Sequence, residues 1–195
     1  MIDEANGSAA ALVVRLAAEF PCLRDEHVFE GRRVNFYKRA QILVAGSVPI
    51  RGKKKKKKTL PPPRPRLTDK PGADLWACFN GQSYGGFDDI GELTMFADYR
   101  VPVTLTMLHC LQFAPKLEAH IKGRKPIASG SPWECQIRGA SIWCIEMIRR
   151  EIRRRHPDAN VNAVLIDFYL YDAAKEMERM GAEGLPHHRT RSIWY

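Results

Sequence analysis

The sequence predicts an all-α fold, in a single domain over residues 9–195. Apolar residues recur at helical spacing in several segments, and no segment shows the strict alternation of a half-buried strand. Prolines and glycines stand where these segments end, as they do at helix boundaries. With 195 residues the chain is long enough to bury a core of its own.

In the first part of the chain we expect two helices. Residues 9–20 repeat apolar side chains at helical spacing and stop at Pro21, which predicts the first helix. Residues 22–33 are predicted to form a loop with a turn at Gly31. Residues 34–45 form a second apolar segment, which we expect to be helical.

Residues 46–73 differ in composition from the rest of the chain. They hold seven lysines and three arginines against one aspartate, so their net charge of +9 equals that of the whole chain. They also hold six of the thirteen prolines and almost no apolar residues to offset the entropy of ordering them. We predict a disordered insertion here. Because the remaining residues sum to zero charge, the basic composition is only a weak indication of nucleic-acid binding.

The second part of the chain is also predicted to be helical. Asp88 or Asp89 is the expected N-cap of a short helix over residues 90–99, which ends before Pro102. Residues 103–122 are expected to form the next helix.

Two further helices are expected towards the end of the chain. Residues 133–156 give the clearest long helix, with Ile137, Ile148 and Ile152 on one face and the arginines on the other. Residues 161–180 begin as a buried apolar stretch and end as an amphipathic helix.

Several classes of protein are excluded or disfavoured. No apolar run approaches the roughly 20 residues that span a bilayer, and the acidic start of the chain is not that of a secretory signal peptide. Five cysteines are widely spaced without a CxxC pair, which predicts reduced thiols in the cytoplasm or nucleus. Six histidines form no HExxH or CxxC…HxxxH pattern, so no metal site is expected.

Asp167 is the most informative position because it lies within the apolar run 164–171. A carboxylate buried there costs several kcal/mol unless it is paired or hydrogen-bonded. It is therefore either a functional carboxylate with a perturbed pKa or a structural residue that pairs with an arginine or caps a helix. Asp172 follows five residues later on a different helical face, and solvent exposure is its simpler interpretation.

Two other charged residues lie among apolar neighbours. Asp98 follows Phe96, and an aromatic ring beside a carboxylate can stack on a purine-like base and accept its N–H groups. The alternative is a surface ion pair beside a core phenylalanine. Lys38 could bind a phosphate or lower its own pKa for catalysis, or it could simply extend to solvent.

Other charged residues have simpler interpretations. Glu134, Arg138 and Glu146 are predicted to make pairs along the long helix. His187 and His188, with the arginines that follow them, could meet an anion but are expected to be exposed.

Four segments, taken together in order, resemble the queuosine salvage protein family, the queuosine 5′-phosphate N-glycosylases/hydrolases. The resemblance covers nearly all of the chain outside the insertion and corresponds to the C-terminal part of these longer proteins. The segments are VFEGRRVNFYKRAQILVA at 28–45, TMFADYRVP at 94–102, ECQIRGASIWCIEM at 134–147 and VLIDFYLYD at 164–172, followed by PHHRTRSIWY at 186–195.

The resemblance implies a helical fold similar to helix-hairpin-helix DNA glycosylases, and cleavage of queuosine 5′-monophosphate to release queuine for tRNA modification. It implies no metal or organic cofactor. The catalytic residues would be Asp167, as nucleophile or transition-state stabiliser, and Lys38. Substrate-binding roles would fall on Phe96, Asp98, Ala163, Val164 and Asp172.

The chemistry suits these residue types. Glycosidic cleavage develops positive charge on the ribose, which a buried carboxylate can stabilise or attack. We expect a monomer in the cytoplasm or nucleus, bound neither to a membrane nor stably to nucleic acid. Two alternatives remain from other classes: a catalytically impaired fragment that acts as a binding module, and an RNA-binding protein that works through the lysine run at 53–58.

Overall fold

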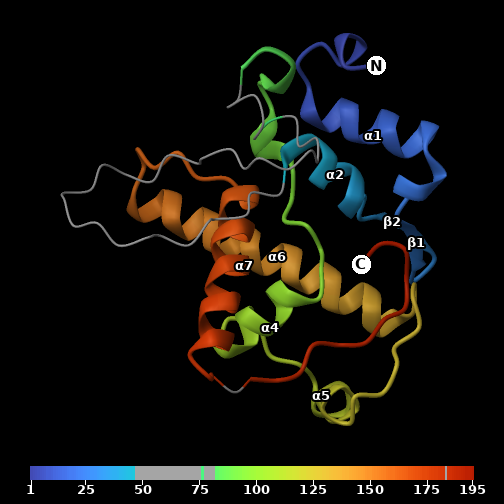
Figure 1. The fold of residues 1–195 in the computed structure, drawn as a ribbon, viewed down its shortest axis with the longest axis vertical. Coiled ribbons are helices and arrows are strands. Elements are labelled where there is room, and N and C mark those ends of the chain that lie inside the picture. The colour runs from blue at the N-terminus through green and yellow to red at the C-terminus, as the bar shows by residue number, and fades with distance from the viewer. Residues whose placement is uncertain (47–75, 77–81, 183) are drawn as a thin grey trace.

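The computed structural model describes residues 1–46, 76, 82–182 and 184–195, and helices dominate them (Figure 1). The prediction of a mainly helical fold is confirmed for these residues. The helices are α1 (Ala9–Glu19), α2 (Lys38–Ala45), α4 (Arg100–Met107), α5 (Pro115–Lys122), α6 (Pro132–Arg155) and α7 (Ala163–Arg179). Short 3-10 turns lie at Asp3–Ala5, Pro21–Leu23, Ser83–Gly85 and Ile90–Glu92, and two strands at β1 (Glu26–Phe29) and β2 (Arg32–Asn35).

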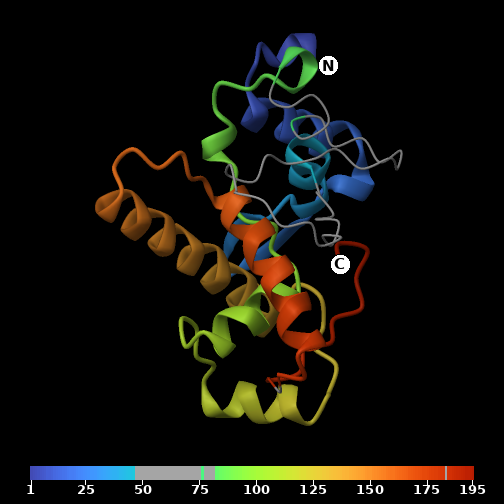
Figure 2. The same cartoon turned by 60° about the vertical axis from the view of Figure 1, so that its left-hand side comes forward.

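The helices form two packed groups. Helices α1 and α2 pack together near the N-terminus, while α4, α6 and α7 pack against one another at the centre (Figures 1 and 2). Helix α5 lies at the opposite end from α1, and the segment after α7 passes near it before turning back towards the β-hairpin.

An extended segment, residues 93–99, joins the two groups. Its Leu93 and Phe96 belong to the apolar cluster of α1 and α2, whereas Met95 belongs to the cluster between α4, α6 and α7. Helix α7 likewise contributes Val164 to the first cluster and Leu170 to the second. Apolar packing on both sides therefore fixes the segment against α7, which is where the candidate site lies.

A β-hairpin is the main departure from the all-α prediction. Glu26–Phe29 and Arg32–Asn35 pair antiparallel, with Phe29 opposite Arg32. Glu30 and Gly31 both have positive φ, 50° and 75°, as the tight turn of a two-residue hairpin requires. The turn predicted at Gly31 is confirmed, but its surroundings form strands rather than a loop.

The hairpin also corrects the second helix. A helix over residues 34–45 is wrong at its start, because β2 extends to Asn35 and α2 begins only at Lys38. Tyr37 separates the two with a left-handed φ of 46°. The apolar pattern was continuous through this change of structure and could not show it.

The short helix predicted over residues 90–99 is wrong beyond its first turn. Only Ile90–Glu92 form a 3-10 turn, which the Asp89 side chain does not cap, and the chain is then extended. Pro102 does not end a helix but lies in the first turn of α4. Proline is tolerated there because the first N–H groups of a helix lack intrahelical partners.

The helix predicted over residues 103–122 is divided in two. Helix α4 ends at Met107 and α5 begins at Pro115, which occupies the first helical position. Between them His109 adopts a positive φ of 56°. Proline at this position suits a helix start, so Pro115 favours a break where the apolar spacing alone predicts continuity.

The last two helices confirm the prediction. Helix α6 is capped by Ser131, whose hydroxyl accepts the Glu134 N–H, and α7 by Asn162, whose side chain accepts the Leu165 N–H. The expectation that the arginines of α6 all lie on its outer face is wrong for Arg138, which is fully buried.

Two further expectations can be compared with the structure, and a third falls on residues that it does not describe. Among the described residues no helix is long and apolar enough to cross a bilayer. The described cysteines, Cys22, Cys110, Cys135 and Cys144, are free thiols. The predicted insertion at 46–73 lies outside the described residues apart from Gly46, as does Cys78.

Candidate active site

Asp167 lies in α7, one turn after its capping residue, and faces the extended segment. Its side chain is only 5% exposed, and its Oδ2 accepts a hydrogen bond of 2.8 Å from the backbone N–H of Phe96. Burial raises the pKa of Asp167 well above the usual range of a carboxyl group, and the nearby Asp98 raises it further. The Phe96 N–H and the Lys38 ammonium act in the opposite direction.

Asp98 lies two residues after Phe96 in the extended segment and is partly exposed. Its Oδ1 accepts the backbone N–H groups of Arg100 at 2.9 Å and Val101 at 3.0 Å, and so satisfies the free donors at the start of α4. Desolvation raises the pKa of Asp98, while the Val101 N–H and Lys38 counteract that shift. With two N–H donors against one for Asp167, Asp98 is the better stabilised anion.

Lys38 is the first residue of α2 and is only 9% exposed, so it does not simply extend to solvent. Burial lowers the pKa of its ammonium. The charge of Asp98 opposes this shift most strongly, those of Asp25 and Asp167 oppose it less, and Arg138 adds to it. The Lys38 Nζ lies 5.6 Å from the ring centroid of Tyr195.

The fold thus brings together three of the predicted residues, Lys38, Asp98 and Asp167, from separate parts of the chain. Their charges act on one another, as the direction of each pKa shift shows. Two carboxyl groups and one ammonium in a poorly solvated site titrate as a coupled set. Such a set can keep one carboxylate ionised and offer a proton from a neighbouring group.

In the described structure, the side chains of the other predicted site residues make no hydrogen bond or ion pair with the three charged groups. Phe96 is 5% exposed, and its ring packs against Phe168 at a centroid distance of 5.8 Å. Ala163 and Val164 are fully buried in the apolar clusters, so their side chains face core residues. Asp172 is partly exposed, and its buried Oδ2 has no hydrogen-bond partner among the described residues. Substrate contacts at these positions stay a prediction.

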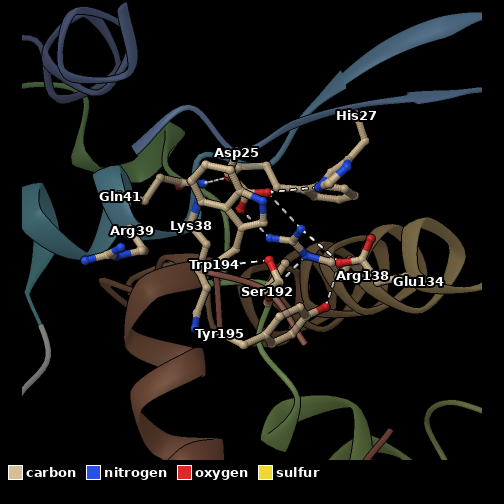
Figure 3. Close-up of polar contacts among 12 residues, drawn as sticks. Asp25, His27, Lys38, Arg39, Gln41, Glu134, Arg138, Ser192, Trp194 and Tyr195 are labelled. Atoms are coloured by element: carbon tan, nitrogen blue, oxygen red, sulfur yellow. Dashed lines mark hydrogen bonds and ion pairs between the residues drawn. The ribbon is translucent and has the colours of Figure 1, made fainter. Parts of the chain in front are cut away.

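A buried ionic network that the sequence analysis missed lies beside these residues (Figure 3). Arg138 of α6 contacts both carboxylate oxygens of Asp25, at 2.9 and 2.5 Å, and Glu134 at 3.2 Å. All three side chains are 0% exposed. Glu134 and Arg138 do pair along the helix as expected, but in the core rather than on a solvated face.

Tyr195 completes the network. Its hydroxyl donates to Glu134 at 2.8 Å and lies 3.2 Å from His188 Nε2. His188 is therefore buried rather than exposed, and its desolvation lowers its pKa to about 4. The ring of the adjacent His187 packs against that of Tyr99 in a tilted arrangement, with a centroid distance of 5.0 Å.

The sequence pattern could have indicated only part of this network. Arg138 lies at helical spacing from the buried Ser141 and Ile145, which could have placed it on the inner face of α6. Asp25 offers no such signal, because Arg24 and Glu26 flank it and give the local sequence the pattern of a surface.

Tyr195 also lines a cavity of about 540 Å³. Tyr99, directly after Asp98, lines it, and so does the whole segment from His187 to Ser192. Among the described residues, no group of three or more histidine, cysteine, aspartate or glutamate side chains could hold a metal ion.

Comparison with known proteins identifies the family. The model of the family "Queuosine salvage protein" matches residues 1–55 and 72–195. The chain belongs to this family. Within it, the proteins named queuosine 5′-phosphate N-glycosylase/hydrolase from Schizosaccharomyces pombe, Mus musculus and Sphaerobacter thermophilus are 37%, 35% and 39% identical to it.

These alignments cover the whole of this chain but only 49–50% of each relative. The chain therefore spans about half the length of the queuosine salvage proteins that it matches. The family match also omits residues 56–71, within the lysine- and proline-rich segment. Each motif on which the resemblance was based lies in a matched range.

Proposed function

We propose that the chain hydrolyses the N-glycosidic bond of queuosine 5′-monophosphate and releases queuine. The observation that carries this proposal is the buried Asp167 carboxyl, held by the Phe96 N–H beside Lys38 and Asp98. Its membership of the queuosine salvage family, whose relatives carry the name of this activity, supports the choice of substrate.

In the proposed reaction Asp167 acts on the ribose. As the bond between the anomeric carbon and the base breaks, positive charge develops on the sugar, and a carboxylate in a poorly solvated site stabilises that charge or attacks the carbon. Water then supplies the hydroxyl at the anomeric carbon, and the departing base takes a proton. Asp167 is needed as an anion for this role, and the neighbouring Lys38 ammonium favours the anion.

The base lies, in this proposal, against the extended segment. Asp98 accepts N–H groups of the 7-deazaguanine edge and fixes its orientation, and Phe96 contributes a stacking surface. Ala163, Val164 and Asp172 line the remainder of the substrate site. Lys38 holds the two carboxylates in their ionised forms.

The proposal also includes the substrate class, the oligomeric state, the fold relationship and the location of the protein. The relatives' name implies a small nucleotide substrate for them, and we propose the same class of substrate for this chain. We propose further that the chain is a monomer and forms no stable complex with nucleic acid. We also propose a helical arrangement related to helix-hairpin-helix DNA glycosylases, no cofactor, and a cytoplasmic or nuclear location consistent with free thiols.

The test is release of queuine from queuosine 5′-monophosphate by the purified chain, measured by chromatography. Asp167→Asn should lower kcat/KM by about 100- to 1,000-fold, the usual loss when one such electrostatic contact is removed. Asp158→Asn is the matched control, because Asp158 is exposed in the loop before α7 and should leave the rate unchanged.

Two results would contradict the proposal. If the folded chain binds the nucleotide without turnover, it is a binding module rather than an enzyme. If Asp167→Asn and Asp158→Asn release queuine equally well, another residue carries the reaction.

A further inference from the structure

Arg138 joins the two segments that carry the candidate site. Its Nε donates to the backbone carbonyl of Ala97 at 3.1 Å, and Ala97 lies between Phe96 and Asp98 in the extended segment. Its two terminal nitrogens bind the Asp25 carboxylate from the other side. A planar guanidinium with several donors in fixed directions can hold two such partners in a defined relation, which a lysine cannot.

Asp25 in turn holds the start of α2. Its carboxylate accepts the Lys38 N–H at 3.3 Å, and its backbone carbonyl accepts the N–H groups of Phe36 at 2.9 Å and Tyr37 at 3.3 Å. Helix α2 has no side-chain cap of its own, since Tyr37 occupies the capping position in a left-handed conformation. Asp25 therefore takes the place of a local cap and fixes the residue from which the Lys38 side chain extends.

Tyr195 encloses this arrangement on the side of the cavity. Its ring lies 5.4 Å from the Arg138 guanidinium and 5.6 Å from Lys38 Nζ, and its hydroxyl donates to Glu134 (Figure 3). The same hydroxyl lies 3.2 Å from His188 Nε2. One aromatic side chain thus covers both the bridging arginine and the lysine of the site, and limits the access of water to them.

We infer that Arg138 and Tyr195 are positioning residues for the reaction. Arg138 sets Lys38 against Asp98 and Asp167, and Tyr195 keeps Lys38 poorly hydrated. Neither residue touches the reacting atoms in this inference, which rests on the proposed function for its kinetic part. A purely structural network would stabilise the fold but would leave the titration of Lys38 and the turnover of folded protein unchanged.

The first test uses Arg138→Lys, which keeps the positive charge but cannot bind the Ala97 carbonyl and the Asp25 carboxylate at the same time in the same geometry. With the charge kept, a change at Lys38 reports its position rather than a lost cation. We expect the pKa of Lys38, measured by competitive acetylation and mass spectrometry across pH, to shift away from its wild-type value, because Asp98 and Asp167, whose charges raise that pKa, then act on it from other distances. We also expect kcat to fall at least tenfold with KM within about twofold.

The second test uses Tyr195, in case Arg138→Lys does not fold. Tyr195→Phe keeps the ring over Lys38 but loses the hydroxyl contacts, whereas Tyr195→Leu loses both. Only Tyr195→Leu should raise the pKa of Lys38 markedly. Ile193→Ala is the control in the same segment, because the Ile193 side chain is 60% exposed, and it should change neither measurement.

The labelling measurement does not depend on activity, so the two proposals can fail separately. Absence of queuine release from the wild-type chain would count against the proposed function alone. If folded Arg138→Lys, or Tyr195→Leu, titrates at Lys38 as wild type does, the positioning role is wrong and the network is only part of the core.

Discussion

Asp167 places a carboxyl group where water is largely excluded and where a second carboxyl lies close by. The protein therefore bears an energetic cost at this position that an amide would not bear. Such costs are typical of functional sites, since a residue selected only for stability would be neutral or apolar here.

Asp167→Asn should stabilise the protein at neutral pH while it lowers kcat/KM by the predicted factor of about 100 to 1,000. A carboxyl whose pKa is raised in the folded state destabilises that state progressively as pH rises from the unfolded pKa, near 4, through the folded pKa. The amide has no such dependence, so thermal unfolding should show a Tm at pH 7.5 at least equal to wild type. The difference should shrink as pH falls towards 4. A variant clearly less stable than wild type at pH 7.5 would show that the Asp167 anion stabilises the fold.

The rate should depend on pH in a bell shape. On the acid side, kcat/KM should rise with pH as Asp167 ionises, at a pH well above 4 because its pKa is raised. On the alkaline side kcat/KM should fall as Lys38 loses its proton, at a pH below the usual titration range of lysine, because burial lowers the pKa of Lys38. Stopped assays of queuine release from pH 4 to 10 measure both limbs. A flat profile over this range would contradict the assigned roles.

The same residues show how much of the site could be predicted from sequence. Asp167 and Lys38 were identifiable because a charge within an apolar run has a cost that needs an explanation. Asp25 and Tyr195 were not, because their importance comes from partners more than 60 residues away. Local sequence carries no trace of such partners.

At the scale of elements, Asp89 shows the same limit. It was expected to cap a helix at residue 90, yet its carboxylate binds the start of α1. Oδ1 accepts the Ala9 N–H at 2.5 Å, and Oδ2 accepts the Ser8 hydroxyl at 2.6 Å and the Ala10 N–H at 3.3 Å. The sequence indicated a capping aspartate at residue 88 or 89, but the prediction that it caps a helix at residue 90 was wrong. The long helices α6 and α7 were predictable because their capping residues and apolar faces are local.

Asp89→Ala should therefore destabilise α1, which is distant in sequence. The loss of a cap costs about 1–2 kcal/mol, and a negative charge at a helix N-terminus adds to the effect. Chemical unfolding should show this decrease, and amide exchange should accelerate most at residues 9–11. Asp88→Ala is the control, since Asp88 is exposed and should change stability by less than about 0.5 kcal/mol. Equal stability of the two variants would contradict the capping role.

At the scale of the whole molecule, charge and fold are carried by different parts of the chain. The basic residues that set the net charge of +9 are concentrated in residues 46–73, and the family match omits residues 56–71. The described residues instead form the packed helices, and some of their charged side chains form buried pairs such as Asp25–Arg138. The site should thus be independent of the basic segment.

Deletion of residues 56–71 tests this independence. It removes a net charge of +5, from six basic residues against Asp69. We expect queuine release within about twofold of the undeleted chain, and weaker binding to single-stranded RNA at low salt, measured by fluorescence anisotropy. Loss of release from a deletion variant whose circular dichroism is unchanged would show that the segment contributes to the site.

The most direct test of the account is a crystal structure of Asp167→Asn with queuosine 5′-monophosphate. We predict that the anomeric carbon of the ribose faces the side chain at position 167. The base should rest against Phe96 with its edge on Asp98, and Lys38 should lie beside both acidic positions. A nucleotide bound with its ribose remote from position 167, for example in the cavity beside Tyr195, would contradict the assignment of Lys38, Asp98 and Asp167 as the glycosidase site.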